Sequence, residues 1–221
     1  MMTFAELKRR AIERKGAEAL EAAMPVPPDT PLADLPDDRI LSEFTKRIFQ
    51  SGFSWTVIEN KWPGFEAAFH GFDIARNAMM SDDDLDRHLA NREIVRNGAK
   101  ILAVRDNAVF LAELAREHGT AARALAHWPV ADTIGLFDML KRRGARLGGV
   151  TGQYALRSLG YDAFILSKSA VAALNAAGVI SGAATSARAQ RQFRRHSTPG
   201  LGKAGKAGRG SAGSWALTVP D

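Results

Sequence analysis

The sequence predicts an all-α fold, on three observations. Apolar residues recur at helical spacing in several segments, short glycine-containing loops separate these segments, and no alternating apolar–polar pattern extends beyond a few residues. With 221 residues, 46% of them hydrophobic, the chain can build one sizeable domain or two small helical lobes. The sequence has no cysteine, so neither disulfides nor thiolate metal ligands are expected.

The first expected helix spans residues 3–23, which are rich in Ala, Glu, Lys and Arg and only loosely periodic, as on a surface helix. Residues 25–38 hold five of the nine prolines, which cannot continue a helix and predict an extended connector. We therefore assign residues 1–36 to an N-terminal helix and a Pro-rich connector. The next helix begins near Asp37, and its apolar face carries Ile40, Phe44, Ile48 and Phe49.

Beyond that helix, residues 62–73 (WPGFEAAFHGFD) are expected to break and restart the chain, and Ser81 to cap a helix with an acidic first turn. Residues 99–117 have apolar side chains at helical spacing and predict the main core helix. Residues 37–187 are thus expected to form one helical domain. Its shorter helices are predicted at 121–127, 133–143, 152–159 and 167–177.

The positive charge is concentrated in a C-terminal tail, residues 188–221. This tail carries seven Lys and Arg against one Asp, which leaves 23 basic and 23 acidic residues in the rest of the chain. It is rich in Gly and Ala, so we expect partial disorder and a sequence-independent attraction to phosphate. Its Gly200–Lys206 stretch nearly matches a phosphate-binding loop, but Ala207 replaces the required Ser or Thr. A solvated basic tail is the better explanation.

No membrane segment is expected. No apolar stretch approaches the roughly 20 residues needed to cross a bilayer, because charged residues interrupt each one. The start MMTFAELKRR is charged where a secretory signal needs an apolar run. We therefore expect a cytoplasmic protein without a membrane partner, associated with the nucleoid if it is bacterial.

A glycine-rich turn between two expected helices is the main functional signal. The segment 147–152 (LGGVTG) follows the basic residues Lys141–Arg143 and Arg146. Glycines let the backbone approach a ligand, and N–H groups at a helix start favour an anion such as phosphate. On spacing alone, an ordinary cluster of helix-capping glycines explains the turn equally well.

Three ordered motifs resemble the 3-methyladenine DNA glycosylase I family: residues 52–55 (GFSW), 94–101 (IVRNGAKI) and 140–144 (LKRRG). The turn at 147–152 resembles the hairpin of helix-hairpin-helix DNA glycosylases, with Gly148 in place of the usual proline. The similarity covers roughly residues 38–175. It implies a helix-hairpin-helix glycosylase fold with two helical lobes around a cleft. It also implies a monomer that flips an alkylated purine out of double-stranded DNA and hydrolyses its bond to deoxyribose, without a cofactor, in base excision repair.

The resemblance also assigns roles to residues. Trp55 matches the tryptophan that lines the base pocket, with Phe53 beside it, although a tryptophan in an apolar run can equally be a core residue. Arg96 and Lys100 are four residues apart and can contact phosphate from one helical face, yet they can equally be solvated charges. The expected DNA-binding residues are Lys141, Arg146, Gly148, Gly149, Thr151, Gly152, Arg96 and Lys100.

Several groups typical of the family are missing. Arg47 stands where the family has a glutamate, eight residues before the pocket tryptophan, and it cannot accept a proton. Glu43, one turn earlier, can either pair with Arg47 or reach the base pocket. Ser169 or Lys168 replaces the superfamily's aspartate after the hairpin. Lys168 could attack the sugar as an amine, but a solvated lysine explains it better. Asp162 is the nearest carboxylate, although a turn role explains it as well.

We therefore take Glu43, Ser169 and Asp162 as candidate catalytic residues and place Arg47 in the base pocket. The family's zinc clasp needs two cysteines and two histidines, so no metal is expected. A purine alkylated at N3 is cationic and a good leaving group, so an enzyme without the missing groups can still act. The predicted function is excision of a 3-methyladenine-type base. The alternative is a glycosylase-like DNA-binding module that has lost catalysis.

Overall fold

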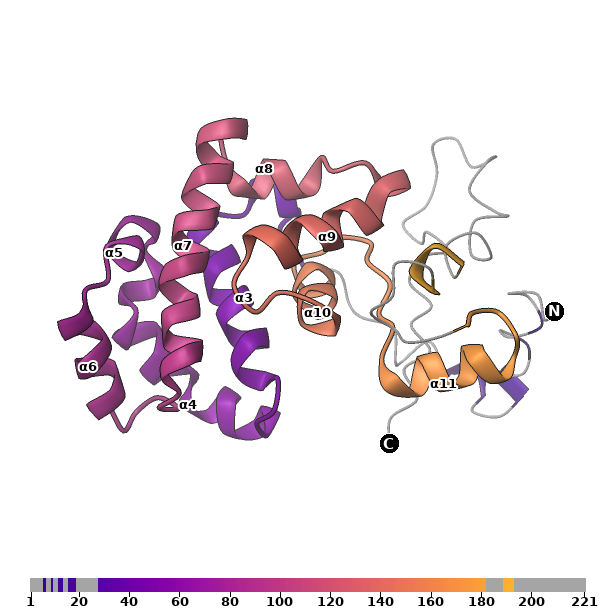
Figure 1. Cartoon of the computed structure of the whole chain (residues 1–221), viewed down its shortest axis with the longest axis horizontal. Coiled ribbons are helices and arrows are strands. Elements are labelled where there is room, and N and C mark those ends of the chain that lie inside the picture. Colours follow the sequence, from indigo (N-terminus) through magenta and orange to yellow (C-terminus); the bar gives the residue numbers. More distant parts are fainter. Residues whose placement is uncertain are drawn as a thin grey trace. The chain divides into compact units, whose positions relative to one another are not determined.

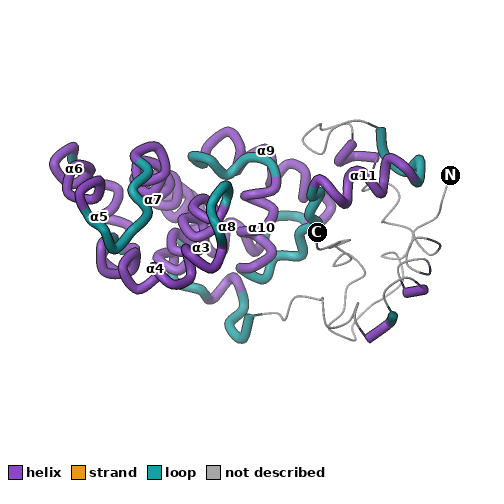
Figure 2. Tube along the Cα trace, turned by 90° about the horizontal axis from the view of Figure 1, so that it is seen from below, coloured by secondary structure: helices purple, strands orange, loops and turns teal. Residues whose placement is uncertain are grey.

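The computed structural model describes residues 28–181 and 189–192, together with residues 6, 9, 12, 13 and 16–18. Every regular element of these residues is a helix, which confirms the all-α prediction (Figure 1). The trace in Figure 2 likewise shows helices joined by loops, with no strand in the part described. Most of the predicted helix at 3–23 and of the basic tail lies outside the described residues.

The chain divides into two compact units. One unit consists of residues 28–161 and holds the elements from η1 to α10. The other unit combines residues 1–27 with residues 162–221 and includes α11 (Lys168–Ala176). The domain boundaries expected after residues 36 and 187 stay predictions.

In the 28–161 unit, short loops join η1 (Leu32–Asp34), α3 (Asp37–Gln50), α4 (Trp55–Ala68), η2 (His70–Phe72), α5 (Ile74–Ala78), α6 (Asp82–Ala90), α7 (Gly98–His118), α8 (Ala121–Ala126), η3 (Val130–Asp132), α9 (Thr133–Arg143) and α10 (Val150–Ser158). Helices α8, α9, α10 and α11 confirm the four shorter helices predicted from the sequence, each to within two residues at either end. Ser81 caps α6 as expected, and Asp84 completes a capping box with it.

Helix α7 forms the centre of this unit and packs against α3, α5, α6 and α8 (Figure 1). Most of its apolar side chains are buried, which confirms the predicted core helix, although Val109 lies on the outer face and is 41% exposed. The predicted apolar face of α3 is also buried, at Ile40, Phe44, Ile48 and Phe49. These two faces form the core on which the candidate site is built.

Helix α4 runs through the first part of residues 62–73, the segment that was expected to break and restart the chain. Pro63 lies inside the helix, which runs on to Ala68, and it is exposed at the surface. A Cβ at Gly64 would lie 2.5 Å from the carbonyl oxygen of Glu93, so only glycine lets the loop before α7 pass this close to α4. The Pro-Gly pair therefore serves the packing of α4. The break and restart expected in residues 62–73 comes after Ala68, where η2 leads to α5.

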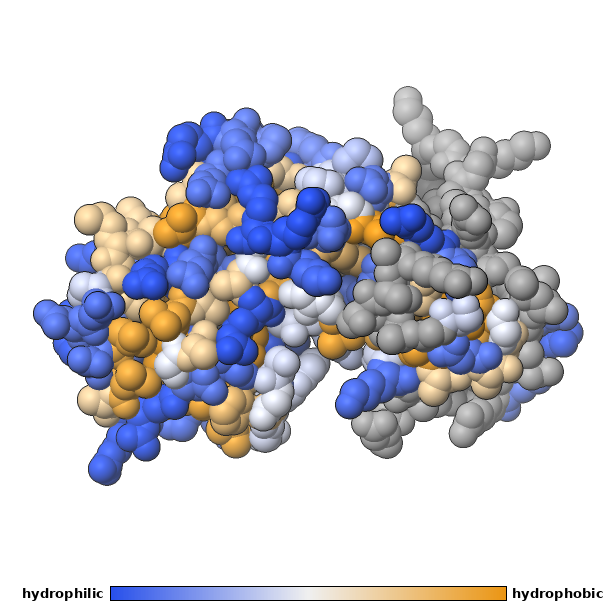
Figure 3. Space-filling model, viewed as in Figure 1, coloured by the Kyte–Doolittle hydropathy of each residue, from blue (hydrophilic) through white to orange (hydrophobic). Residues whose placement is uncertain are grey.

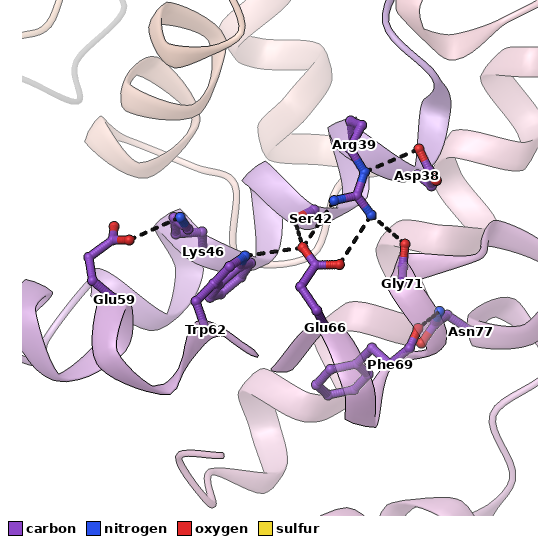
Figure 4. Close-up of polar contacts among 10 residues, drawn as sticks. All are labelled: Asp38, Arg39, Ser42, Lys46, Glu59, Trp62, Glu66, Phe69, Gly71 and Asn77. Atoms are coloured by element: carbon purple, nitrogen blue, oxygen red, sulfur yellow. Dashed lines mark hydrogen bonds and ion pairs between the residues drawn. The ribbon is translucent and has the colours of Figure 1, made fainter. Parts of the chain in front are cut away.

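A polar network joins α3 to α4 (Figure 4). The Glu66 carboxylate accepts hydrogen bonds from Arg39 Nη1 at 3.0 Å, Ser42 Oγ at 2.9 Å and Trp62 Nε1 at 3.1 Å. The Trp62 ring also stacks on two phenylalanine rings, Phe65 and Phe72. Trp62 is therefore a packing residue inside α4.

The surface of the 28–161 unit mixes polar and apolar residues. Hydrophilic and hydrophobic residues are interspersed over the face that Figure 3 shows. Among the described residues, no helix combines the length and the apolar character that a membrane span requires.

Candidate functional site

Glycines shape the turn between α9 and α10. Gly149 is the N-cap of α10 and has a φ of 63°, a conformation that glycine adopts without strain. A Cβ at Gly152 would lie 2.3 Å from the carbonyl oxygen of Leu147, and one at Gly144 would lie 2.8 Å from the carbonyl oxygen of Leu140. Both contacts are too short for a real side chain. The turn can therefore fold back onto the start of α10 only with glycine at these positions.

Two side-chain contacts fix this turn against α7. The buried Asn107 side chain donates from Nδ2 to the carbonyl oxygen of Ala145 at 3.0 Å and accepts from the Ala145 N–H at 2.9 Å. Arg146 donates from Nε to the carbonyl oxygen of Ala99 at 3.1 Å, with its own backbone at a φ of 59°. Such a φ is unfavourable for a residue with a side chain, so the surrounding contacts hold it in place.

The start of α10 has the properties of an anion site. Its N-cap residue is Gly149, which has no side chain to accept a hydrogen bond from the start of the helix. The N–H groups of the first turn, which includes Thr151, therefore have no capping side chain as acceptor. The side chains of Lys141, in the last turn of α9, and of Arg146, in the loop before α10, are exposed. A Cβ at Gly148 would meet only the flexible Lys141 side chain, at 3.3 Å. Backbone N–H groups and cationic side chains together suit a phosphate group.

Trp55 opens α4, and its side chain is a surface feature rather than a core residue. It is 49% exposed, and Phe53 beside it is 39% exposed. The indole contacts Tyr154 of α10 edge to face, with ring centroids 5.8 Å apart and an interplanar angle of 86°. The Arg47 guanidinium lies 5.3 Å from the indole centroid. A broad aromatic surface is thus displayed next to the helix that follows the glycine turn.

Arg47 fastens α3 to α10 beside this indole. It donates from Nε to Glu43 at 2.5 Å, from Nη1 to Gln50 at 2.9 Å and from Nη2 to the hydroxyl of Ser158 at 2.6 Å. The ion pair is largely buried, since the Glu43 and Arg47 side chains are 18% and 17% exposed. Of the two roles considered for Glu43, the structure therefore shows the ion pair with Arg47.

Lys100 points inward, which argues against its expected contact with DNA. It is buried, and its ammonium group donates to three carbonyl oxygens at the end of α3, those of Ile48, Phe49 and Ser51. Burial, and then the charge of Arg146, lower the pKa of Lys100 below its usual value. Arg96 is exposed and precedes α7, whose N-cap is Asn97, so the two cations do not share a helical face.

Replacing Lys100 with methionine is expected to lower the free energy of unfolding by about 1–3 kcal/mol, because three carbonyl oxygens lose their donor. Urea denaturation followed by helical circular dichroism measures the loss. The matched control is Arg96→Met, which removes an exposed cation and is expected to change stability by less than about 0.5 kcal/mol. Equal effects of the two substitutions would show that Lys100 is no better anchored than a surface residue.

Asp162 and Ser169 belong to the other unit, whereas all the contacts of Trp55 given above come from residues 28–161. Ser169 lies in the first turn of α11, which Ser167 caps by accepting from the Ala170 N–H at 3.2 Å. Their catalytic roles stay predictions. In the part of the chain that the structure describes, no three His, Asp or Glu side chains converge as metal ligands.

Three residues of the site were not found from the sequence: Gln50, Tyr154 and Ser158. Tyr154 and Ser158 are four residues apart on α10, so both face Trp55 and Arg47 from the same side of that helix. The sequence did place Tyr154 and Ser158 on one face of a helix, because both lie four residues apart in the helix expected after the glycine turn. What the sequence lacked was the direction in which the helix packs.

Known proteins are similar to this chain in sequence and in fold. The model of a family described as methyladenine glycosylase matches residues 34–136. DNA-3-methyladenine glycosylase 1 of Escherichia coli is 36% identical over 59 residues, which are 27% of this chain and 32% of that protein. The Haemophilus influenzae DNA-3-methyladenine glycosylase shows the same identity and coverage. The match thus spans about a third of these curated relatives.

Solved structures extend the similarity beyond that segment. A mutant of 3-methyladenine DNA glycosylase I from Staphylococcus aureus superposes with a TM-score of 0.52 at 25% identity, covering 59% of this chain and 80% of that one. A second structure of the Staphylococcus aureus protein, which addresses its recognition of 3-methyladenine, gives the same score and identity and covers 79% of its chain.

Proposed function

Because residues 34–136 match the methyladenine glycosylase family, we propose that this chain is a DNA glycosylase that releases alkylated purines of the 3-methyladenine type from double-stranded DNA. The observation that carries the proposal is the half-exposed indole of Trp55, held by Arg47 and Tyr154 next to the helix that starts at the glycine turn. An aromatic face beside a phosphate site suits a nucleotide turned out of the duplex.

In this proposal the α9–α10 turn acts as a helix-hairpin-helix phosphate site, and a monomer suffices. The N–H groups of the first turn of α10, with Lys141 and Arg146, hold the DNA backbone, while Trp55 stacks on the flipped base. Water adds to C1′ of the deoxyribose and loses a proton to solvent, and the N-glycosidic bond breaks with its electron pair passing to the base. An N3-alkylated purine leaves readily because departure neutralises its positive charge, so little acid catalysis is required.

One observation favours a second candidate, a DNA-binding module without catalysis. The Glu43 carboxylate accepts a hydrogen bond from Arg47 Nε at 2.5 Å. Its charge is therefore neutralised by Arg47, and it is not available to activate water. For Glu43 to act on water or on a developing sugar cation, this ion pair has to open.

An incision assay separates the two candidates. The protein is incubated with methylated duplex DNA, and heat and alkali then cleave any abasic site. Breaks that require both methylation and protein support the glycosylase. Binding to the methylated duplex without breaks supports the module instead, and its affinity should fall with added salt because counterions are released from phosphate. A protein that neither produces breaks in the methylated duplex nor binds it would overturn both candidates.

A further inference from the structure

Tyr154 connects the two parts of the proposed site. It follows Val150, the first residue of α10, by four positions, which is about 6 Å along the helix axis. Its ring contacts Trp55 at right angles. A nucleotide with its phosphate at the glycine turn and its base on Trp55 would therefore pass alongside Tyr154.

The hydroxyl group of Tyr154 is uncommitted within the described part of the chain. No hydrogen bond joins it to another described residue, and its side chain is half-buried. The other tyrosine of the chain differs in both respects: Tyr161 is 6% exposed and donates to the carbonyl oxygen of Trp128 at 3.4 Å. Tyrosine hydroxyl groups in partly buried positions usually form a hydrogen bond. The Tyr154 hydroxyl is therefore available for a hydrogen bond with a ligand.

The polar groups around the same indole are already in use. Arg47 donates hydrogen bonds from its three side-chain nitrogens to Glu43, Gln50 and Ser158. Tyr154 is thus the side chain in ring contact with Trp55 that still has a donor and an acceptor to offer among the described residues.

We propose that Tyr154 is a specificity-determining residue whose hydroxyl group forms a hydrogen bond with the polar edge of a purine stacked on Trp55. With ring centroids 5.8 Å apart and the Tyr154 ring perpendicular to the indole, the Tyr154 hydroxyl is within reach of the edge of a base that stacks on Trp55. Stacking on Trp55 accepts every base, since each has an aromatic face, whereas a hydrogen bond to the edge selects among them. The inference rests on the proposed function, because it takes Trp55 as the base surface.

The test compares wild type with Tyr154→Phe, which removes the hydroxyl and keeps the ring, and with Tyr161→Phe as the matched control. Binding of free 3-methyladenine is measured by quenching of tryptophan fluorescence, and release of the base from methylated duplex DNA is measured in parallel. Tyr154→Phe is expected to weaken base binding about 3- to 10-fold, the size of one hydrogen bond, without a change in melting temperature. Tyr161→Phe is expected to bind the base as wild type does.

Equal affinities of wild type and Tyr154→Phe overturn the assignment, and so does the absence of any base binding by wild type. The two measurements keep this inference apart from the proposed reaction. Base binding that depends on the Tyr154 hydroxyl, in a protein that releases no base from DNA, refutes the glycosylase and retains the Tyr154 contact. Base release with unchanged affinity in Tyr154→Phe retains the glycosylase and refutes the contact.

Discussion

Replacing Gly152 with alanine is expected to lower the free energy of unfolding by about 3 kcal/mol and to abolish tight binding to DNA. The added Cβ would lie 2.3 Å from the carbonyl oxygen of Leu147, which is backbone and cannot rotate away. The turn must therefore shift, and Leu147 leaves its buried position. Urea denaturation gives the stability, and titration of a duplex gives the affinity.

Gly148→Ala is the matched control in the same turn. A Cβ there would meet the Lys141 side chain at 3.3 Å, and that side chain can move. We expect a change in stability below about 1 kcal/mol. Similar stabilities for the two variants would contradict the close packing that the structure gives to Gly152.

Replacing Trp55 with alanine is expected to lower kcat/KM for release of 3-methyladenine from methylated DNA by about 5- to 150-fold. This range corresponds to the roughly 1–3 kcal/mol that stacking of an aromatic side chain on a base contributes. The fold should survive, because the Trp55 side chain is half-exposed and contributes little to the core. Quantifying the released base by chromatography, with a melting curve for each variant, separates the loss of stacking from loss of structure.

Val57→Ala is the control for Trp55. Val57 is 44% exposed and lies two residues further along α4, so its truncation also removes apolar surface near the start of that helix. Its release activity is expected to equal that of wild type. If Trp55→Ala also releases base at the wild-type rate, Trp55 does not receive the base.

Helix ends were predicted well where a local signal marks them. Helix α9 spans Thr133–Arg143 as expected, because Asp132 caps its start by accepting from the Gly135 N–H at 3.2 Å and Gly144 follows its end. The apolar face of α3 was also predicted, since helical spacing alone decides which side chains share a face. These properties depend only on neighbours in the chain.

Long-range contacts decided what the sequence did not predict. Arg47 meets Ser158, a residue 111 positions away, and no pattern near either residue indicates that contact. The spacing of Arg96 and Lys100 suggested one helical face, but α7 begins between them and turns Lys100 toward the end of α3. The break expected in residues 62–73 comes after Ala68 rather than at Pro63, and no pattern near Gly64 indicates its close contact with Glu93.

Fluorine NMR of protein labelled with 5-fluorotryptophan tests the central claim, that Trp55 receives the base, most directly. The sequence has four tryptophans, so each resonance can be assigned by single substitution. On addition of 3-methyladenine, the resonance of Trp55 is expected to shift, while those of Trp62 and Trp128 stay in place. A Trp55 resonance that does not move while base or damaged duplex is bound would contradict the account.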